Sequence, residues 1–144
     1  MTTTSRVLFA LALAACTPGA TAPSEPAGTV VGVVDFDGAS PGVLRVAAWG
    51  AFPPVGPPLA EVAIDEPSFP QPYQLRGLPP GRYFVMAIVD VDPDDGDRYH
   101  PRIDPGGTFG RYDSPAAVTT TATAPTVGVD IHLVAPAPGS PWDR

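Results

Sequence analysis

A run of carboxylates in this sequence has a spacing that suits a hard cation. It lies in the segment VDVDPDDGDRYHPRIDPGG, residues 89–107, and follows the most apolar run after residue 28. Aspartates recur at every second position from Asp90, and a glycine that permits a sharp turn comes shortly after them. Calcium loops of the D-x-D-x-D-G type supply oxygen ligands in this way. The predicted calcium ligands are Asp90, Asp92, Asp94, Asp97 and Asp104.

The acidic run departs from an EF-hand in two places. Asp95 stands where an EF-hand has its glycine, and no glutamate follows about eleven residues after Asp90. A second interpretation is a solvated loop that Arg98 and Arg102 partly neutralise, although an exposed ion pair contributes only about 0–1 kcal/mol. Calcium as a cofactor and a metal-free acidic loop both remain open.

The sequence does not indicate catalysis. It has no P-loop, no G-x-S-x-G and no H-E-x-x-H motif. Its two histidines, His100 and His132, lie far apart in the chain, and one imidazole without nearby cysteines is not a zinc pattern. We therefore expect no enzymatic activity and no catalytic residues.

Three aromatic residues are candidates for ligand binding. Phe109 and Tyr112 flank a Gly-Arg pair in the long segment after the acidic run, and Trp49 ends an alternating strand-like stretch. Such aromatic side chains either pack over the end of a β-domain or are displayed to a glycan or peptide. Their exposure distinguishes these two alternatives.

The charge balance argues against nucleic acid as a partner. Fifteen acidic residues against eight basic ones give a net charge of −7, and all the basic residues are arginines. This balance repels polyanions and favours solubility or cation binding.

The first sixteen residues have the features of an export signal. Arg6 precedes a short apolar stretch, Val7–Ala15, which is too short to cross a bilayer. The sequence Leu-Ala-Ala-Cys that ends at Cys16 resembles the lipobox of bacterial lipoproteins, in which the cysteine is lipidated. The resemblance implies an exported protein, anchored by lipid at Cys16 in the bacterial cell envelope, on its periplasmic face or at the cell surface. An ordinary signal peptide with a chance cysteine is the alternative.

The rest of the chain divides into a tether, one domain and a tail. Residues 17–27 are Pro, Ala, Ser and Thr-rich, residues 28–135 form the predicted domain, and residues 136–144 read as a tail. Twenty-one prolines and fifteen glycines separate short apolar runs, which is typical of strands joined by turns. The predicted strands are 29–36, 43–49, 59–64, 73–78, 82–91, 117–123 and 127–134.

Residue alternation within these strands predicts the core. In the second strand, Leu44, Val46 and Ala48 share one face, whereas Arg45 and Trp49 lie on the other. In the last strand, Val127, Val129, Ile131 and Leu133 are expected to share a face. Seven short strands without a helix predict an all-β fold, an antiparallel Greek-key sandwich of the immunoglobulin-like or prealbumin-like kind.

The turn Pro79-Pro80-Gly81 carries a further resemblance. The stretch YQLRGLPPGRYFVMAIVDVDPDDG is similar to a signature of transthyretin-like and Cna-B-like domains, also called carboxypeptidase regulatory-like domains. The resemblance covers roughly residues 28 to 135 and implies a stalk, spacer or binding module without enzymatic activity. We expect Gly81 to adopt a positive φ in this turn, where a β-branched residue would be strained.

Two functions follow from the sequence. In the first, the chain is a non-catalytic, lipid-anchored structural or interaction module of the envelope. In the second, it is a lipoprotein that captures a glycan or peptide through the 92–115 loop. The membrane, through the lipid anchor, is the one partner that the sequence indicates; a protein or glycan partner is unidentified.

Overall fold

The structure, a computed structural model, describes residues 28–39, 42–94, 99–100 and 102–136. These residues form strands and turns without a helix, so the all-β prediction is confirmed. They contain no helix long and apolar enough to span a membrane. Cys16, the 17–27 tether, Asp97 and nearly all of the predicted tail lie outside the described residues.

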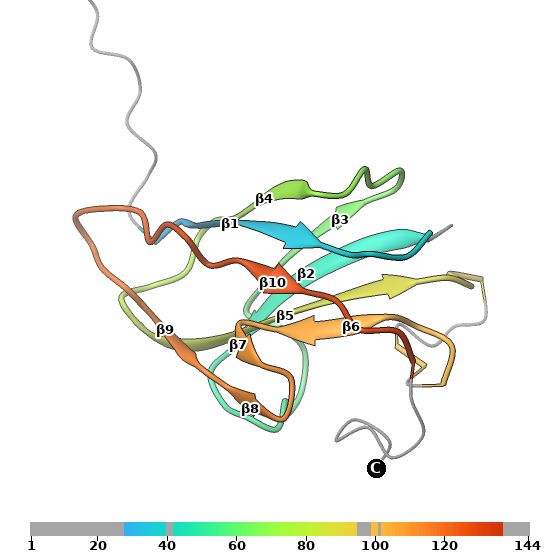
Figure 1. Cartoon of the computed structure of the whole chain (residues 1–144). Helices are drawn as coiled ribbons and strands as arrows, with labels where there is room; N and C mark the ends of the chain where they lie inside the picture. The colour runs from blue at the N-terminus through green and yellow to red at the C-terminus, as the bar shows by residue number, and fades with distance from the viewer. Residues whose placement is uncertain (1–27, 40–41, 95–98, 101, 137–144) are drawn as a thin grey trace, which may run out of the picture.

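The smaller of the two main sheets has three strands. In order they are β10 (Ile131–His132), β1 (Val30–Asp35) and β4 (Gln71–Leu75). β4 runs antiparallel to β1, whereas β10 runs parallel to it. Figure 1 shows these strands together on one side of the domain.

The larger sheet is built around β5 (Gly81–Asp90). On one side, β2 (Val43–Trp49) pairs over all of its residues with residues 84–90 of β5. β3 (Ala60–Ile64) pairs with the other edge of β2. On the other side, β6 (Gly106–Thr108) pairs with residues 86–88 and β9 (Ala117–Thr120) with residues 81–84.

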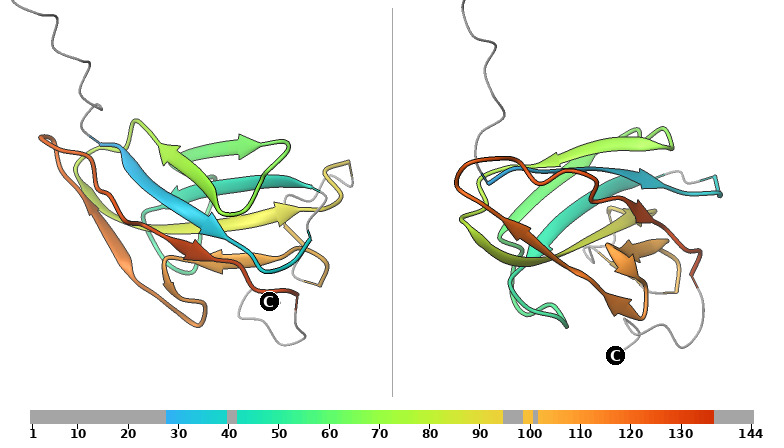
Figure 2. Two further views of the ribbon diagram at one scale, coloured as in Figure 1. Left: turned by 45° about the horizontal axis from the view of Figure 1, so that its top comes forward. Right: turned by 60° about the vertical axis from the view of Figure 1, so that its left-hand side comes forward.

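β6 and β9 thus occupy two halves of the same edge of β5. Between them the chain makes a small hairpin of β7 (Gly110–Arg111) and β8 (Ser114–Pro115). The turned views in Figure 2 show the chain leaving β6 for this hairpin and returning as β9.

The hydrophobic core lies between the two main sheets. In β2, Leu44, Val46 and Ala48 are fully buried, so the predicted alternation of this strand is confirmed. Their counterparts in the small sheet lie on β1, β4 and β10 and the residues next to them. Together the two sheets contribute Val30, Val34, Tyr73, Leu75, Val129, Ile131 and Leu133 from one side, and Leu44, Val46, Ala48, Tyr83, Val85, Ala87, Val89 and Val118 from the other.

β5 is apolar on both of its faces. Its inward residues, Tyr83, Val85, Ala87 and Val89, belong to the core. The residues between them, Phe84, Met86 and Ile88, point to the outer face of the large sheet, the face turned away from the small sheet. Met86 is nevertheless only 6% exposed, so other parts of the chain must cover this outer face.

The predicted strands differ from the observed ones mainly near the C-terminus. Each predicted strand overlaps an observed one, but β10 is only two residues long, and β6, β7 and β8 were not predicted. Val129, Ile131 and Leu133 are buried as expected, whereas Val127 is 70% exposed. Gly128 between them has φ 74°, which breaks the alternation, so the prediction for Val127 is wrong.

The prediction of a positive φ at Gly81 is also wrong. Gly81 begins β5, and the positive φ, 79°, occurs earlier, at Gly77. The reversal before β5 is instead fixed by two hydroxyl groups that donate to the Pro79 carbonyl. Tyr83 Oη lies 2.8 Å and Thr120 Oγ1 2.7 Å from that oxygen.

Tyr73 joins β4 to the chain before β10 through a buried hydrogen bond. Its hydroxyl donates to the Val129 carbonyl at 2.6 Å. Burial, and secondarily the negative charge of Asp130, raise the pKa of the Tyr73 phenol far above its ordinary value of about 10. The folded chain therefore holds this proton more tightly than the unfolded chain does.

We expect Tyr73→Phe to lower the free energy of unfolding by about 1 kcal/mol at pH 7, because the hydrogen bond is lost. In the native chain, the stabilisation linked to the Tyr73 proton is complete below about pH 10 and is lost as the pH rises above it. When urea unfolding is measured between about pH 8 and 11, the free energy of unfolding should therefore fall less with rising pH in Tyr73→Phe than in the native chain. Thr120→Val, which removes a hydrogen bond to the Pro79 carbonyl but no titratable group, should keep the native loss of unfolding free energy at alkaline pH. Equal losses in all three chains would contradict this assignment.

Candidate functional site

A hollow of about 240 Å³ lies on the outer face of the large sheet. Its lining comes from β2, β3, β5 and β6, from the connection between β2 and β3, and from the segment after β5. The lining residues are Arg45, Ala47, Trp49, Pro54, Pro58, Glu61, Met86, Ala87, Ile88, Tyr99, Gly106 and Gly107.

The floor of the hollow is the apolar outer face of β2 and β5. Ala47 lies directly opposite Met86 in the ladder, and Ile88 lies opposite Gly106 of β6. A Cβ atom at Gly106 would lie 3.5 Å from the Tyr99 ring and 3.7 Å from Ile88 Cγ2. The missing side chain at Gly106 therefore leaves space between these two residues.

One wall is the proline-rich connection between β2 and β3, which curls below β5 in Figure 1. Trp49 Nε1 donates to the Gly56 carbonyl at 3.2 Å, which ties the connection back to the end of β2. Phe52 of the connection packs against Phe84 of β5, with ring centroids 5.9 Å apart. These contacts hold Pro54 and Pro58 at the rim.

The charged end of the hollow is a chain of three side chains. Arg45 Nη1 lies 3.4 Å from Glu61 Oε1, and Arg45 Nε lies 3.2 Å from Asp90 Oδ2. The Asp90 side chain is 3% exposed, against 22% for Arg45 and 24% for Glu61. Because a buried carboxylate is costly without a partner, Arg45 is needed to keep Asp90 in place.

Asp104 positions the opposite wall. Its carboxylate accepts hydrogen bonds from the backbone N–H of Val91 at 3.0 Å and of His100 at 2.6 Å. The His100 carbonyl in turn accepts from the backbone N–H groups of Ile103 and Asp104. The segment after β5 is thus closed by a carboxylate, and this closure places Tyr99 against Gly106.

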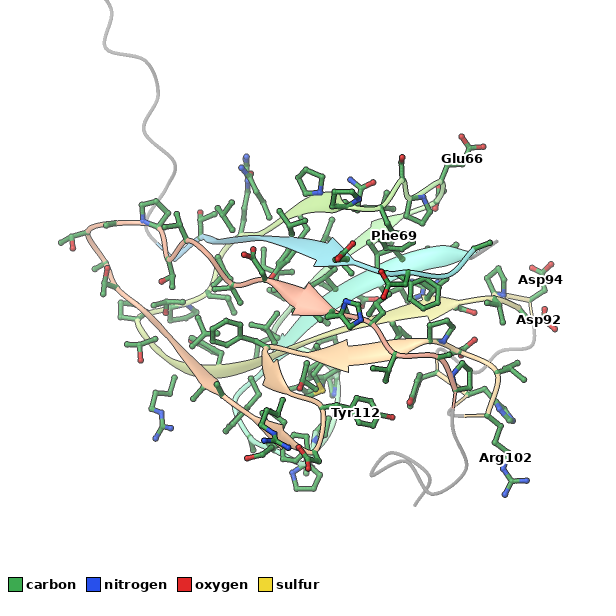
Figure 3. All side chains as sticks on the ribbon, viewed as in Figure 1. Glu66, Phe69, Asp92, Asp94, Arg102 and Tyr112 are labelled. Carbon is green, nitrogen blue, oxygen red and sulfur yellow. The ribbon has the colours of Figure 1, made fainter. Side chains whose placement is uncertain are left out.

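The predicted calcium ligands are not brought together among the described residues. Asp90 is paired with Arg45, and Asp104 accepts two backbone hydrogen bonds. Figure 3 shows Asp92 and Asp94 at the outer tip of the segment after β5, and Asp97 lies outside the described residues. In the described ranges, no three His, Cys, Asp or Glu side chains form a group that can hold a metal ion. Calcium binding stays a prediction.

The three aromatic candidates have different positions. Trp49 lines the hollow, but Phe109 packs against the hydrophobic core from the inner side. Tyr112, labelled in Figure 3, is half-buried in the turn between β7 and β8. It is not among the residues that line the hollow. The sequence analysis missed Tyr99, Met86 and Ile88, although the apolar outer face of β5 was visible as a signal.

Neither histidine lies in the hollow. His132 is exposed, and its two ring nitrogens lie 3.8 Å from Asp35 and 3.9 Å from Asp37. His100 is half-buried, and its backbone rather than its ring closes the segment after β5.

No protein-family model matches this chain, and neither do any of the curated proteins or solved structures with which it was compared.

We expect Arg45→Met to lower the free energy of unfolding by about 3 kcal/mol, because Asp90 is left buried without its partner. The double variant Arg45→Met with Asp90→Leu should recover most of this loss, since no buried charge remains. Denaturant unfolding of the two single variants and the double variant measures the coupling.

Arg111→Met is a matched control for this series. Arg111 and Asp113 also form an ion pair, at 3.3 Å, but their side chains are 81% and 67% exposed. Its loss should cost less than about 1 kcal/mol. If Arg45→Met cost no more than Arg111→Met, Arg45 would not be the group that stabilises Asp90.

Proposed function

We propose that this chain is a non-catalytic, lipid-anchored interaction module, and that the hollow on the outer face of the large sheet is its contact surface. The observation that carries the proposal is the apolar lining of the hollow. Concave apolar surfaces with a few polar groups at one side are the usual form of binding sites. The charged groups at its edge, Arg45 and Glu61, already form an ion pair, which favours recognition over chemistry.

The chemistry of the lining favours a peptide segment over a glycan. Trp49 and Tyr99 offer aromatic surface, but Arg45 and Glu61 are the charged side chains of the lining, and they lie together. A sugar presents many hydroxyl groups that need hydrogen-bond partners once buried. The volume, about 240 Å³, is also below the roughly 300–1,000 Å³ typical of small-molecule pockets.

The rim extends the apolar surface beyond the hollow. The connection that carries Pro54 and Pro58 also exposes Val55, which is 83% accessible, and Leu59 follows it at 61%. Exposed apolar side chains next to a concave site are typical of interaction surfaces. A bound peptide therefore has apolar contacts both inside the hollow and along its rim.

The proposal includes a seven-stranded Greek-key sandwich as the fold of the domain. If β6 and β9 count as one strand position beside β5, the two sheets together have seven positions, as in the predicted sandwich. β3 and β4 lie side by side at the border of the two sheets, and β5 returns beside β2. The resulting order, β5-β2-β3-β4, fits the Greek-key rule. This order supports a transthyretin-like or Cna-B-like domain.

The proposed function also includes a cellular location and a role for the acidic loop. The lipobox-like sequence at Cys16 supports export and lipid anchoring in the bacterial envelope, with residues 17–27 as the tether. The proposal also includes a weak calcium site at the tip of the acidic loop, which the exposed carboxylates of Asp92 and Asp94 support. Calorimetric titration with calcium decides that point.

The hollow is tested with an aromatic probe, N-acetyl-tryptophanamide, added to the whole chain with ¹³C-labelled methionine methyl groups. The chain has two methionines, and Met86 lies in the floor of the hollow. We expect millimolar binding that shifts the Met86 methyl signal. Gly106→Leu should weaken this binding by tenfold or more, because its side chain points into the hollow without meeting the backbone.

Thr119→Leu is the matched control, since Thr119 is exposed on the same outer face in β9 but does not line the hollow. It places the same leucine side chain on the outer face, away from the hollow, and should leave binding unchanged. Both variants must melt cooperatively for the comparison to count. Unchanged binding in Gly106→Leu, or no shift of Met86 at saturating probe, would exclude the hollow as the contact surface.

A further inference from the structure

We propose that the hollow has an occupant within this chain, the proline-rich C-terminal segment APGSPWDR, residues 137–144, with Trp142 as the group that enters it. This inference rests on the proposed function, because it assigns a peptide to the same contact surface.

The described chain ends beside the hollow. Val134 and Gly106 exchange two backbone hydrogen bonds, of 3.0 and 3.1 Å, and so form an antiparallel bridge at the edge of β6. Gly106 lines the hollow. The last backbone pairing of the described chain, at Val134, therefore lies three residues before position 137 and beside the strand that borders the contact surface.

The segment is long enough to reach the floor of the hollow. Neighbouring strands lie about 4.8 Å apart, so β5 and β2 lie about 5 and 10 Å from β6. A proline-rich chain in an extended conformation advances about 3.1 Å per residue. The six steps from Pro136 to Trp142 span roughly 19 Å by this rule, which exceeds the distance from β6 to β2.

The residue types fit the lining. Extended proline-rich peptides bind to grooves that aromatic side chains line, and here Trp49 and Tyr99 supply the aromatic surface. An indole is a large apolar group that suits a floor of Ala47 and Met86. At the charged end, Asp143 is opposite in charge to Arg45, and Arg144 is opposite in charge to Glu61.

An occupant within the chain also makes the contact surface switchable. A short connection gives the segment an effective concentration in the millimolar range, so contacts with a dissociation constant below that concentration are mostly formed. A second peptide must displace the segment, so its apparent affinity is its intrinsic affinity multiplied by the fraction of hollows that are free. The tail would then select for partners that bind the hollow more tightly than it does itself.

The experiment measures whether the segment lies over Met86 in the whole chain. The chain has one cysteine, Cys16, so Cys16→Ser with Ser140→Cys places a single nitroxide label in the segment. Oxidised and reduced label are compared through the Met86 methyl signal of ¹³C-methionine protein. We expect the oxidised label to reduce this signal at least twofold more in this chain than in the same labelled chain with Gly106→Leu.

Trp142→Ala, in the labelled chain, is the second variant and changes none of the described residues. It should lose the excess broadening as Gly106→Leu does, whereas Thr119→Leu should keep it. Equal broadening in all four labelled chains would overturn the proposal, because it would reflect the length of the connection alone. Broadening that appears only when nitroxide-labelled and ¹³C-labelled chains are mixed would also overturn it, since the occupant would then come from a second copy.

Binding of N-acetyl-tryptophanamide distinguishes the proposed occupant from the proposed contact surface. If the segment occupies the hollow, Trp142→Ala should increase the affinity for N-acetyl-tryptophanamide about threefold or more, because a competitor is removed. Equal affinity with and without Trp142 would leave the contact surface intact and reject its occupant. No probe binding in either chain would reject the contact surface itself.

Discussion

A central strand that is apolar on both faces sets the main constraint on this domain. Two sheets that pack face to face bury one face of each strand, yet β5 presents Met86 and Ile88 on the face that turns away from the core. Apolar surface of this size is costly in water. Segments outside the two sheets reduce this exposure. The proline-rich connection covers one part of the outer face of β5, and the segment that carries Tyr99 covers another part.

The positions of the acidic residues follow from the same constraint. The Asp104 carboxylate links two described parts of the segment beside β6, because it accepts hydrogen bonds from the backbone N–H groups of Val91 and His100. Asp90 is buried at the end of β5, where Arg45 compensates its charge across the ladder. Two of the five predicted calcium ligands therefore have structural partners, and the cover that they stabilise leaves a hollow because Gly106 has no side chain.

The sequence predicts the parts of the fold that depend on alternation. β2 shows this most clearly, because each of its residues faces either the core or the outer side, as the period of two requires. The same rule fails at Val127, where the positive φ of Gly128 breaks the period, and at β6, whose Gly-Gly-Thr sequence has no alternation to detect. The site was harder to predict, since Trp49 and Tyr99 are 50 residues apart in the chain and line the same hollow only because the strand pairing and the Asp104 hydrogen bonds place them there. No local sequence pattern contains such an arrangement.

The central claim is that the chain's own segments cover the outer face of β5 and leave a hollow beside Gly106. Nuclear Overhauser effects between the Gly106 α-protons and the Tyr99 ring, and between the Phe52 and Phe84 rings, test it most directly. We predict both sets, since the Tyr99 ring borders the Cβ position of Gly106 and the two phenylalanine centroids are 5.9 Å apart. An outer face on which Phe84, Met86 and Ile88 contact only neighbouring strands would contradict the account.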